Sequence, residues 1–294
     1  MTTGEGGGRT PDPGPRAPLS VVITARNEEE QLPGALESVV GWADEIVVVL
    51  DPRTRDRSGE LARAAGARVL EHPFVSSGAQ CNWGLEQAVN GWVLVLDADE
   101  RVTPTLRSAI EEALTRPVHQ AYALRRTNFA FGRGMRFGDW GRDWVVRLLD
   151  CERARFEERS VHGAVHAGSV GRLRGELLHD TLRSLDQYLP KVHDYALRGA
   201  ADLVAAGRRA SVSRAVAHAE WRFVRGLFLR LGILDGPAGW AVAVLLAHGT
   251  FLKWLAAWDL QRHSGSGVAP GVGGGRSPVP GPRSPGSDPA GTSG

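Results

Sequence analysis

The stretch Trp92-Val93-Leu94-Val95-Leu96-Asp97-Ala98-Asp99-Glu100 decides the fold class. Its apolar half predicts a buried strand, and the carboxylates of Asp97 and Asp99 follow where that strand ends. In α/β sheets, ligands bind beyond the carboxyl ends of the strands, so acids at this point indicate a binding site rather than a solvated turn. Neighbouring carboxylates repel each other, and a bound cation removes that repulsion. The stretch therefore predicts an α/β fold with a metal held for phosphate chemistry.

Strands and helices alternate through the first third of the chain. Two further apolar runs end in polar residues. The run at 19–24 leads into Arg26 and Asn27, and the run at 45–50 leads into Asp51 and Asp56. The expected series comprises strands at 19–24, 45–50, 67–71 and 92–96, and helices at 31–40, 58–65 and about 78–88.

Right-handed crossovers make these strands parallel, so their carboxyl ends lie at one edge of the sheet. The polar residues that follow them are expected to converge there: Arg26, Asn27, Asp51, Asp56, Asp97 and Asp99. Several polar strand ends on one edge describe a pocket. The alternative is that each Asp only caps the helix that follows it, and this alternative is strongest for Asp56.

Composition limits the class of protein. At 294 residues with 42% hydrophobic residues, the chain is long enough for one substantial domain with additional helices. The net charge of +2 gives no argument for nucleic acid, and no such partner is expected. Cys81 and Cys151 stand apart, so they indicate neither a disulfide framework nor a zinc site and favour a reducing compartment. The first residues lack a secretory signal pattern, so a cytoplasmic location is predicted.

The chain divides into four parts. Residues 1–17 and 264–294 are rich in small and turn-forming residues, and both are expected to be disordered tails. Residues 18–182 hold the alternating strands and helices of the predicted α/β domain. Residues 183–263 show helical spacing and are interpreted as a helical extension.

The end of that extension, from Trp240 to Leu260, is strongly apolar. His248 and Lys253 interrupt it, so it falls short of the ~18 clean apolar residues expected of a membrane span. Two interpretations stay open. Preceding arginines and several Trp residues would suit peripheral contact with an anionic inner membrane face, whereas apolar helices also pack on a catalytic domain or on a second subunit.

The motifs LSVVITARNEEE (19–30), VVVLDPRTRDRS (47–58) and GAQCNWGLEQAVNGWVLVLDADE (78–100) resemble family 2 glycosyltransferases. The likeness is to the branch that includes the lipopolysaccharide-core β-glucosyltransferases, and it extends to about Leu260. The resemblance implies a GT-A type, Rossmann-like mixed sheet, mostly parallel and flanked by helices. It also implies a hexosyltransferase that takes a nucleoside diphosphate sugar as donor and a glycan or glycolipid as acceptor.

The resemblance assigns roles to single residues. It places Asp51 on the nucleoside base, and Asp97 and Asp99 on a divalent cation that binds the diphosphate. Nucleotide contacts are implied for the first loop and for a helix start, namely Thr24, Arg26, Asn27, Glu28, Gly78 and Asn82, and the strand-end argument adds Asp56. The chain departs from the family at Cys81, where Arg is usual, and at Pro52-Arg53, where Ser-Gly is usual, which leaves the nucleotide base open.

The reaction needs a cation and a base. A cation on the phosphate oxygens neutralises the leaving group, and Mg²⁺ and Mn²⁺ both suit carboxylates with substrate phosphates. Inversion also needs a carboxylate that takes the acceptor proton. The segment 138–149 resembles the acceptor-side motif and makes Asp143 the first candidate for that base, with Asp139 second. The alternative is an acid paired only with Arg142 or Arg147.

Later motifs add less. The Glu that commonly follows the family's His is Gly163 here, so any role of that carboxylate is lost or moved. His162 could contact the diphosphate or a metal, but a lone His in a β-rich stretch is more often structural, and the same interpretation is given to His179.

The leading hypothesis is an inverting, metal-dependent glycosyltransferase. One alternative makes polyprenyl phosphate the acceptor, and another is a non-catalytic module that kept only the nucleotide-sugar pocket. A nucleotidyltransferase is disfavoured, because the loop at 25–28 lacks the glycines that grip a triphosphate.

Overall fold

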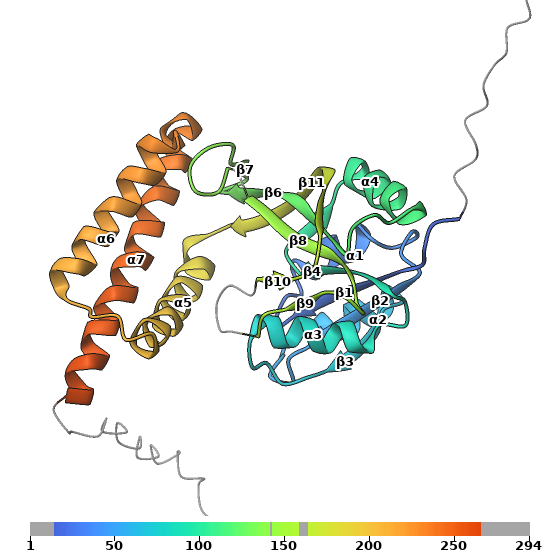
Figure 1. The fold of residues 1–294 in the computed structure, drawn as a ribbon, viewed down its shortest axis with the longest axis horizontal. Coiled ribbons are helices and arrows are strands. Elements are labelled where there is room, and N and C mark those ends of the chain that lie inside the picture. The colour runs from blue at the N-terminus through green and yellow to red at the C-terminus, as the bar shows by residue number, and fades with distance from the viewer. Residues whose placement is uncertain (1–14, 142, 159–163, 266–294) are drawn as a thin grey trace, which may run out of the picture.

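The computed structural model describes residues 15–141, 143–158 and 164–265 (Figure 1). In these residues a nine-stranded sheet carries helices on both faces, and further helices follow it in the C-terminal part. The main strand order is β3-β2-β1-β4-β8-β6-β11-β5, and β7 (Arg133–Gly134) pairs with β6. The predicted α/β class is therefore confirmed.

The first half of the sheet is parallel, as predicted. β1 (Leu19–Ala25) lies between β2 (Glu45–Leu50) and β4 (Trp92–Asp97), and β3 (Arg68–Glu71) pairs with β2. The register sets Thr24 beside both Val49 and Asp97. The ends of these strands consequently lie at one edge of the sheet.

Helices cover both faces of this half. α1 (Leu32–Glu37), α2 (Ser58–Ala64) and α4 (Pro104–Thr115) contribute to one core, and α3 (Ser77–Gln87) packs on the opposite face. Because strand side chains alternate, Val21 of β1 lies in the first core and Val22 in the second. α1 is shorter than the predicted helix at 31–40. The Ser38 hydroxyl at its end donates to the carbonyl of Ala35 at 2.7 Å, a local bond that competes with continued helix.

The second half of the sheet is mixed. β8 (Asp143–Asp150) is antiparallel to β4 and to β6 (Ala121–Ala130), and β11 (Val170–Leu182) runs parallel to β6. β5 (Glu100–Val102) is antiparallel to β11, which sets His179 opposite Glu100. A separate small sheet pairs β9 (Arg155–Phe156) with β10 (Val165–His166). Antiparallel pairs thus have a larger share of the sheet than the expected, mostly parallel arrangement.

The C-terminal helices are α5 (Leu185–Ala205), α6 (Val212–Val224) and α7 (Gly236–Gly265). Between α6 and α7 the chain forms a π-helical turn, η1 (Arg225–Leu229), and a 3-10 turn, η2 (Gly232–Asp235). α7 packs along α5 and α6, and together they extend to one side of the sheet (Figure 1). By length and composition alone, Gly232–His263 is long and apolar enough to span a membrane, which the sequence analysis did not expect.

A buried ion cluster ties these helices to the sheet. The side chain of Asp139, in the loop before β8, is 3% exposed and pairs with Arg222, Arg225 and Arg230 at 2.7, 3.2 and 2.6 Å. The carboxylate of Asp235 in η2 accepts from the backbone N–H of Phe137 at 2.9 Å. A buried carboxylate without a partner is costly, so three cations around Asp139 indicate a structural role and not a free base.

Candidate active site

The turn between β4 and β5 carries the acids that the sequence analysis singled out. Glu100 is fully buried, and its carboxylate pairs with Arg126 at 3.1 Å and with Arg147 at 2.9 Å. It also accepts a hydrogen bond from the backbone N–H of Asp97 at 3.0 Å. Burial alone would raise the pKa of Glu100, but Arg147, His179 and Arg126 outweigh it and lower that pKa. Glu100 therefore stays ionised and holds the turn in place.

Asp97 points toward the same arginine. Its carboxylate forms an ion pair with Arg147, while its side chain stays 40% exposed. Burial raises the pKa of Asp97, against the opposing charge of Arg147. Asp97 is thus anchored to β8 and still accessible from the strand ends.

Asp99 faces the end of β11. Its carboxylate lies 3.3 Å from Nε2 of His179, and Nδ1 of His179 lies 2.7 Å from the side-chain oxygen of Asn128. Burial alone lowers the pKa of His179, but the Asp99 carboxylate outweighs it and raises that pKa. In the same pair, His179 overcomes the opposite effect of burial and lowers the pKa of Asp99 to about 2. His179, interpreted above as structural, therefore belongs to this site.

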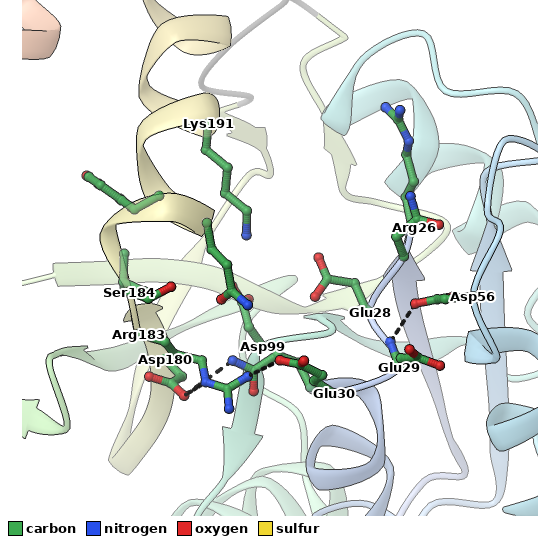
Figure 2. A pocket seen from close by; sticks show the side chains of 15 residues that line it. Arg26, Glu28, Glu29, Glu30, Asp56, Asp99, Asp180, Arg183, Ser184 and Lys191 are labelled. Carbon is green, nitrogen blue, oxygen red and sulfur yellow. Dashed lines mark hydrogen bonds and ion pairs between the residues drawn. The ribbon is translucent and has the colours of Figure 1, made fainter.

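A cavity of about 450 Å³ opens beside Asp99 (Figure 2). Its walls come from the loop after β1, the loop before α2, the end of β11 and the start of α5. Of the predicted site residues, Arg26, Asn27, Glu28, Asp56 and Asp99 line it.

Hydrogen bonds join the loops after β1 and β2. Asn27 has a positive φ of 54°, and its side-chain oxygen accepts from the backbone N–H of Arg55 at 2.8 Å. The Asp56 carboxylate accepts from the backbone N–H groups of Glu29 at 2.9 Å and Ser58 at 3.0 Å. Asp56 therefore binds the first residue of α2, but Arg57 holds the N-cap position and Asp56 also lines the cavity, so helix capping alone does not account for this acid.

Glu28, an acid of the loop after β1, has a pKa that is shifted from its ordinary value. Burial raises its pKa to about 7, and the charges of Asp99 and Asp56 add to that effect while Lys191 opposes it. A carboxyl in this state changes charge near neutral pH, which is typical of functional sites.

Asp51, predicted to contact the nucleoside base, is 2% exposed and already occupied. Arg53 donates to it from its backbone N–H at 2.8 Å and from its guanidinium at 2.9 and 2.5 Å. These hydrogen bonds from Arg53 lower the pKa of Asp51 to about 2. Arg53, which departs from the family pattern, therefore occupies the carboxylate of Asp51 that was expected to contact the nucleoside base.

Gly78 and Asn82 do not line the cavity. The Asn82 amide donates to the carbonyl of Phe156 and accepts from its backbone N–H, each at 2.9 Å. A Cβ on Gly78 would meet the Glu157 carbonyl oxygen at 2.1 Å. Both residues thus hold the segment at 156–158 against α3, and their predicted nucleotide contacts stay predictions.

Asp143 begins β8, away from the cavity lining. Its carboxylate lies 2.6 Å from a guanidinium nitrogen of Arg126 and accepts from the Asn128 amide at 3.3 Å. An ion pair was the alternative for this acid, but Arg126 forms it rather than Arg147, which pairs with Asp97 and Glu100. Arg142, His162 and Gly163 lie outside the described residues.

The donor set fits one divalent cation together with substrate oxygens. In the described ranges, no group of three or more acidic, His or Cys side chains is assembled around one point. Asp99 and His179 lie together, however, and Asn128 can fix the His179 ring with Nε2 toward Asp99. Mg²⁺ and Mn²⁺ commonly combine one or two protein ligands with phosphate oxygens and water.

Thr24, a predicted nucleotide contact, lies at the end of β1 beside Asp97 and does not line the cavity.

Sequence reasoning missed the network around these acids. Arg126, Arg147 and Asn128 were not proposed as site residues, and together they link Asp97, Glu100, Asp143 and His179. One signal was present, because Arg147 interrupts the apolar run of β8. A charge inside a buried strand needs a partner. Asp143 was named from the sequence as a possible partner of Arg147, which instead pairs with Asp97 and Glu100.

The sheet and the acidic cavity at its strand ends define the GT-A class of α/β proteins. The chain belongs to glycosyl transferase family 2, whose family model matches residues 20–174. It is therefore a glycosyltransferase.

Relatives extend the likeness over most of the chain. A lipopolysaccharide core biosynthesis glycosyltransferase of Rhizobium meliloti is 29% identical over 260 residues, which cover 85% of this chain and 94% of that protein. An uncharacterized glycosyltransferase of Rickettsia prowazekii is 26% identical over 262 residues, 84% of this chain and 88% of the relative. A solved glucosyl-3-phosphoglycerate synthase from Mycobacterium tuberculosis, in complex with Mg²⁺ and uridine-diphosphate, has a TM-score of 0.42 at 17% identity and covers 66% of this chain and 81% of that one.

Proposed function

We propose that the protein is an inverting, metal-dependent hexosyltransferase that moves a sugar from a nucleoside diphosphate to a hydroxyl of a glycan or glycolipid. The observation that carries the proposal is the meeting of Asp99 and His179 beside an acidic cavity at the carboxyl edge of the sheet. The lipopolysaccharide relative supports the acceptor class, because it aligns over most of both chains. In this proposal, residues 18–182 form the catalytic domain and residues 183–263 the helical extension.

The cation, Mg²⁺ or Mn²⁺, would be held by Asp99 and His179, with Asp97 as the further carboxylate. When bound, it supplies positive charge that offsets the charge of the departing diphosphate. The chain's own residues prepare that place. Arg147 and Glu100 fix the turn that carries Asp97 and Asp99, and Asn128 orients His179.

Asp143 is the proposed base. It shares the amide group of Asn128 with the network that reaches His179, so it belongs to the same polar layer as Asp99. In the described structure its carboxylate pairs with Arg126, so proton transfer from an acceptor requires that pair to separate.

The first experiment measures sugar transfer across a panel of nucleoside diphosphate sugars, with and without Mg²⁺ or Mn²⁺. We expect turnover only with metal, and we expect Asp99→Asn to lower it by about 100-fold or more without lowering the unfolding temperature appreciably. Asp194→Asn is the matched control, because Asp194 is an exposed acid of α5 that pairs with Arg198 outside the cavity.

Each other outcome has a defined meaning. Donor binding without turnover for any donor would support the hypothesis of a non-catalytic binding module over that of an enzyme. Transfer to polyprenyl phosphate but to no saccharide would replace the acceptor class. Full activity of Asp143→Asn would remove the base assignment.

We also propose that the helical extension contacts an anionic membrane face. Exposed apolar side chains concentrate between the end of α6 and the start of α7, including Trp221, Phe228, Leu229, Leu231, Leu234 and Trp240. Arg222, Arg225 and Arg230 occur in the same segment and share the single buried carboxylate of Asp139. An apolar surface with an excess of arginines complements anionic lipid headgroups.

A further inference from the structure

The charges that line the cavity do not by themselves match a nucleoside diphosphate. Six carboxylates line it, those of Glu28, Glu29, Glu30, Asp56, Asp99 and Asp180. A diphosphate is also anionic, and like charges repel each other most where water is scarce. Donor binding therefore requires cations in this cavity that are not already engaged.

Three basic side chains belong to the lining, and they differ in how free they are. Arg183 is engaged, because its guanidinium pairs with Glu30 at 2.9 Å and with Asp180 at 3.4 Å. Arg26 extends its guanidinium away from Asp99 (Figure 2). The ammonium of Lys191 reaches from α5 into the space above Glu28 and Asp99 (Figure 2) and has no hydrogen bond or ion pair with any residue that the structure describes.

The start of α5 is built to present this side chain. Ser184, Gln187, Tyr188 and Lys191 all line the cavity, and their spacing is that of one helix face. Lys191 therefore faces the donor side of the cavity because of its position in the helix, and the side chain can adjust to a ligand without moving the backbone.

The choice of lysine is itself unusual in this chain. Among 35 Lys and Arg residues only two are lysines, Lys191 and Lys253. Lys253 lies on α7, where its aliphatic chain packs against Gly199 and burial lowers its pKa. Lysine is a compact point charge with three donors on a flexible stem, which suits a phosphate group whose position changes during a reaction.

We propose that the ammonium of Lys191 binds the diphosphate of the sugar donor, on the side of the cavity opposite the sheet edge. The inference rests on the proposed function and adds to it a ligand-binding residue from the helical extension. Lys191 then supplies positive charge to the leaving group from the side of α5, and a cation held by Asp99 would supply it from the sheet edge. The extension is in that case part of the donor site.

Binding is tested by calorimetry on the full chain with Mn²⁺ and one of UDP, GDP, CDP or inorganic pyrophosphate. Pyrophosphate removes the dependence on the nucleoside base. We expect Lys191→Met to lower the affinity for the diphosphate by about tenfold, because an ion pair of this kind contributes on that scale. Lys191→Arg should keep most of the wild-type affinity. Lys253→Met is the matched control and should bind as the wild type does.

Chemical labelling gives a second, independent measurement. The protein is acetylated with a limiting amount of N-hydroxysuccinimidyl acetate, and the modification of each lysine is followed by mass spectrometry. Mn²⁺ with the bound diphosphate should slow acetylation of Lys191 several-fold and leave Lys253 unchanged. Because the chain has only these two lysines, the assignment of the protected site is unambiguous.

Failure of this inference is distinguishable from failure of the proposed function. If Asp99→Asn abolishes diphosphate binding while Lys191→Met binds like the wild type and Lys191 is not protected, the inference is wrong and the proposed function stands. If the wild type binds no diphosphate in the presence of Mn²⁺, both are wrong.

Discussion

At the residue scale, Arg53 shows how one departure from a family pattern changes the meaning of its neighbour. Asp51 was expected to meet the nucleoside base, but Arg53 donates to both of its carboxylate oxygens, from its backbone N–H and from its guanidinium. If a nucleoside base binds at this strand end, as the family resemblance implies, it must either displace the Arg53 guanidinium or contact it. The short sequence separation means that this pair forms locally, whatever the rest of the site does.

The Asp51–Arg53 pair predicts a pH-dependent contribution to stability. The pKa of Asp51 falls to about 2 in the folded chain, below its ordinary value of 3.8, so the pair stabilises the folded state above about pH 4. That contribution is lost as the pH falls from about 4 toward 2. We expect Asp51→Asn to unfold at lower urea concentration than the wild type at pH 6, and the difference to shrink markedly at pH 3.

The control is Glu37→Gln, an exposed acid of α1. Its unfolding midpoint should follow the wild type at both pH values. A difference between Asp51→Asn and the wild type that is as large at pH 3 as at pH 6 would show that the stabilisation does not come from the charge of Asp51.

At the element scale, the parallel half of the sheet was predictable and the mixed half was not. Each of β1, β2 and β4 is a short apolar run closed by polar residues, and crossover helices oblige such strands to run in the same direction. Nothing local specifies that β8 pairs with β4, or that β11 brings His179 opposite Glu100. The acids at the strand ends could therefore be named from the sequence, whereas their partners depend on long-range strand order.

The helix start at Gly78 yields a prediction about α3. Alanine is normally better than glycine in a helix, but a Cβ here would meet the Glu157 carbonyl oxygen at 2.1 Å. We expect Gly78→Ala to lower the free energy of unfolding by about 1–3 kcal/mol, measured by urea denaturation. Gly91→Ala is the control, since a Cβ at that position has nothing within 4 Å, and its effect should stay within about 0.5 kcal/mol. A stable Gly78→Ala protein that no longer binds the donor would instead support the nucleotide contact implied by the family.

At the scale of the whole molecule, two surfaces differ in the chemistry of their side chains. The cavity at the sheet edge is lined by many acids, whereas the segment between α6 and α7 exposes apolar side chains among arginines. The buried Asp139 cluster connects that segment to the loop before β8. The extension is thus tied to Asp139, which lies at the start of the segment 138–149 that resembles the acceptor-side motif.

Vesicle binding tests the membrane contact. We expect the full chain to sediment with vesicles of phosphatidylglycerol and phosphatidylcholine, but not with phosphatidylcholine alone, and added salt should weaken this binding. Leu229→Ser with Leu234→Ser should reduce it by about tenfold or more, because both side chains are more than half exposed, at 63% and 57%. Val75→Ser with Val89→Ser is the control, because these residues are exposed in the α/β domain, at 78% and 75%.

The vesicle experiment also separates the two interpretations of this surface. Sedimentation with vesicles that is unaffected by the Leu229 and Leu234 changes would contradict the assignment of the contact. A dimer in solution that the same changes dissociate would make a second copy of the chain the occupant of this surface.

The cavity has walls from distant parts of the sequence, since Arg26 to Gln31 form one side and Asp180 to Lys191 another. During synthesis the early strands leave the ribosome long before α5 exists. The cavity is therefore complete only once the chain has been made as far as Lys191, because several of its lining residues come from the segment between Asp180 and Lys191.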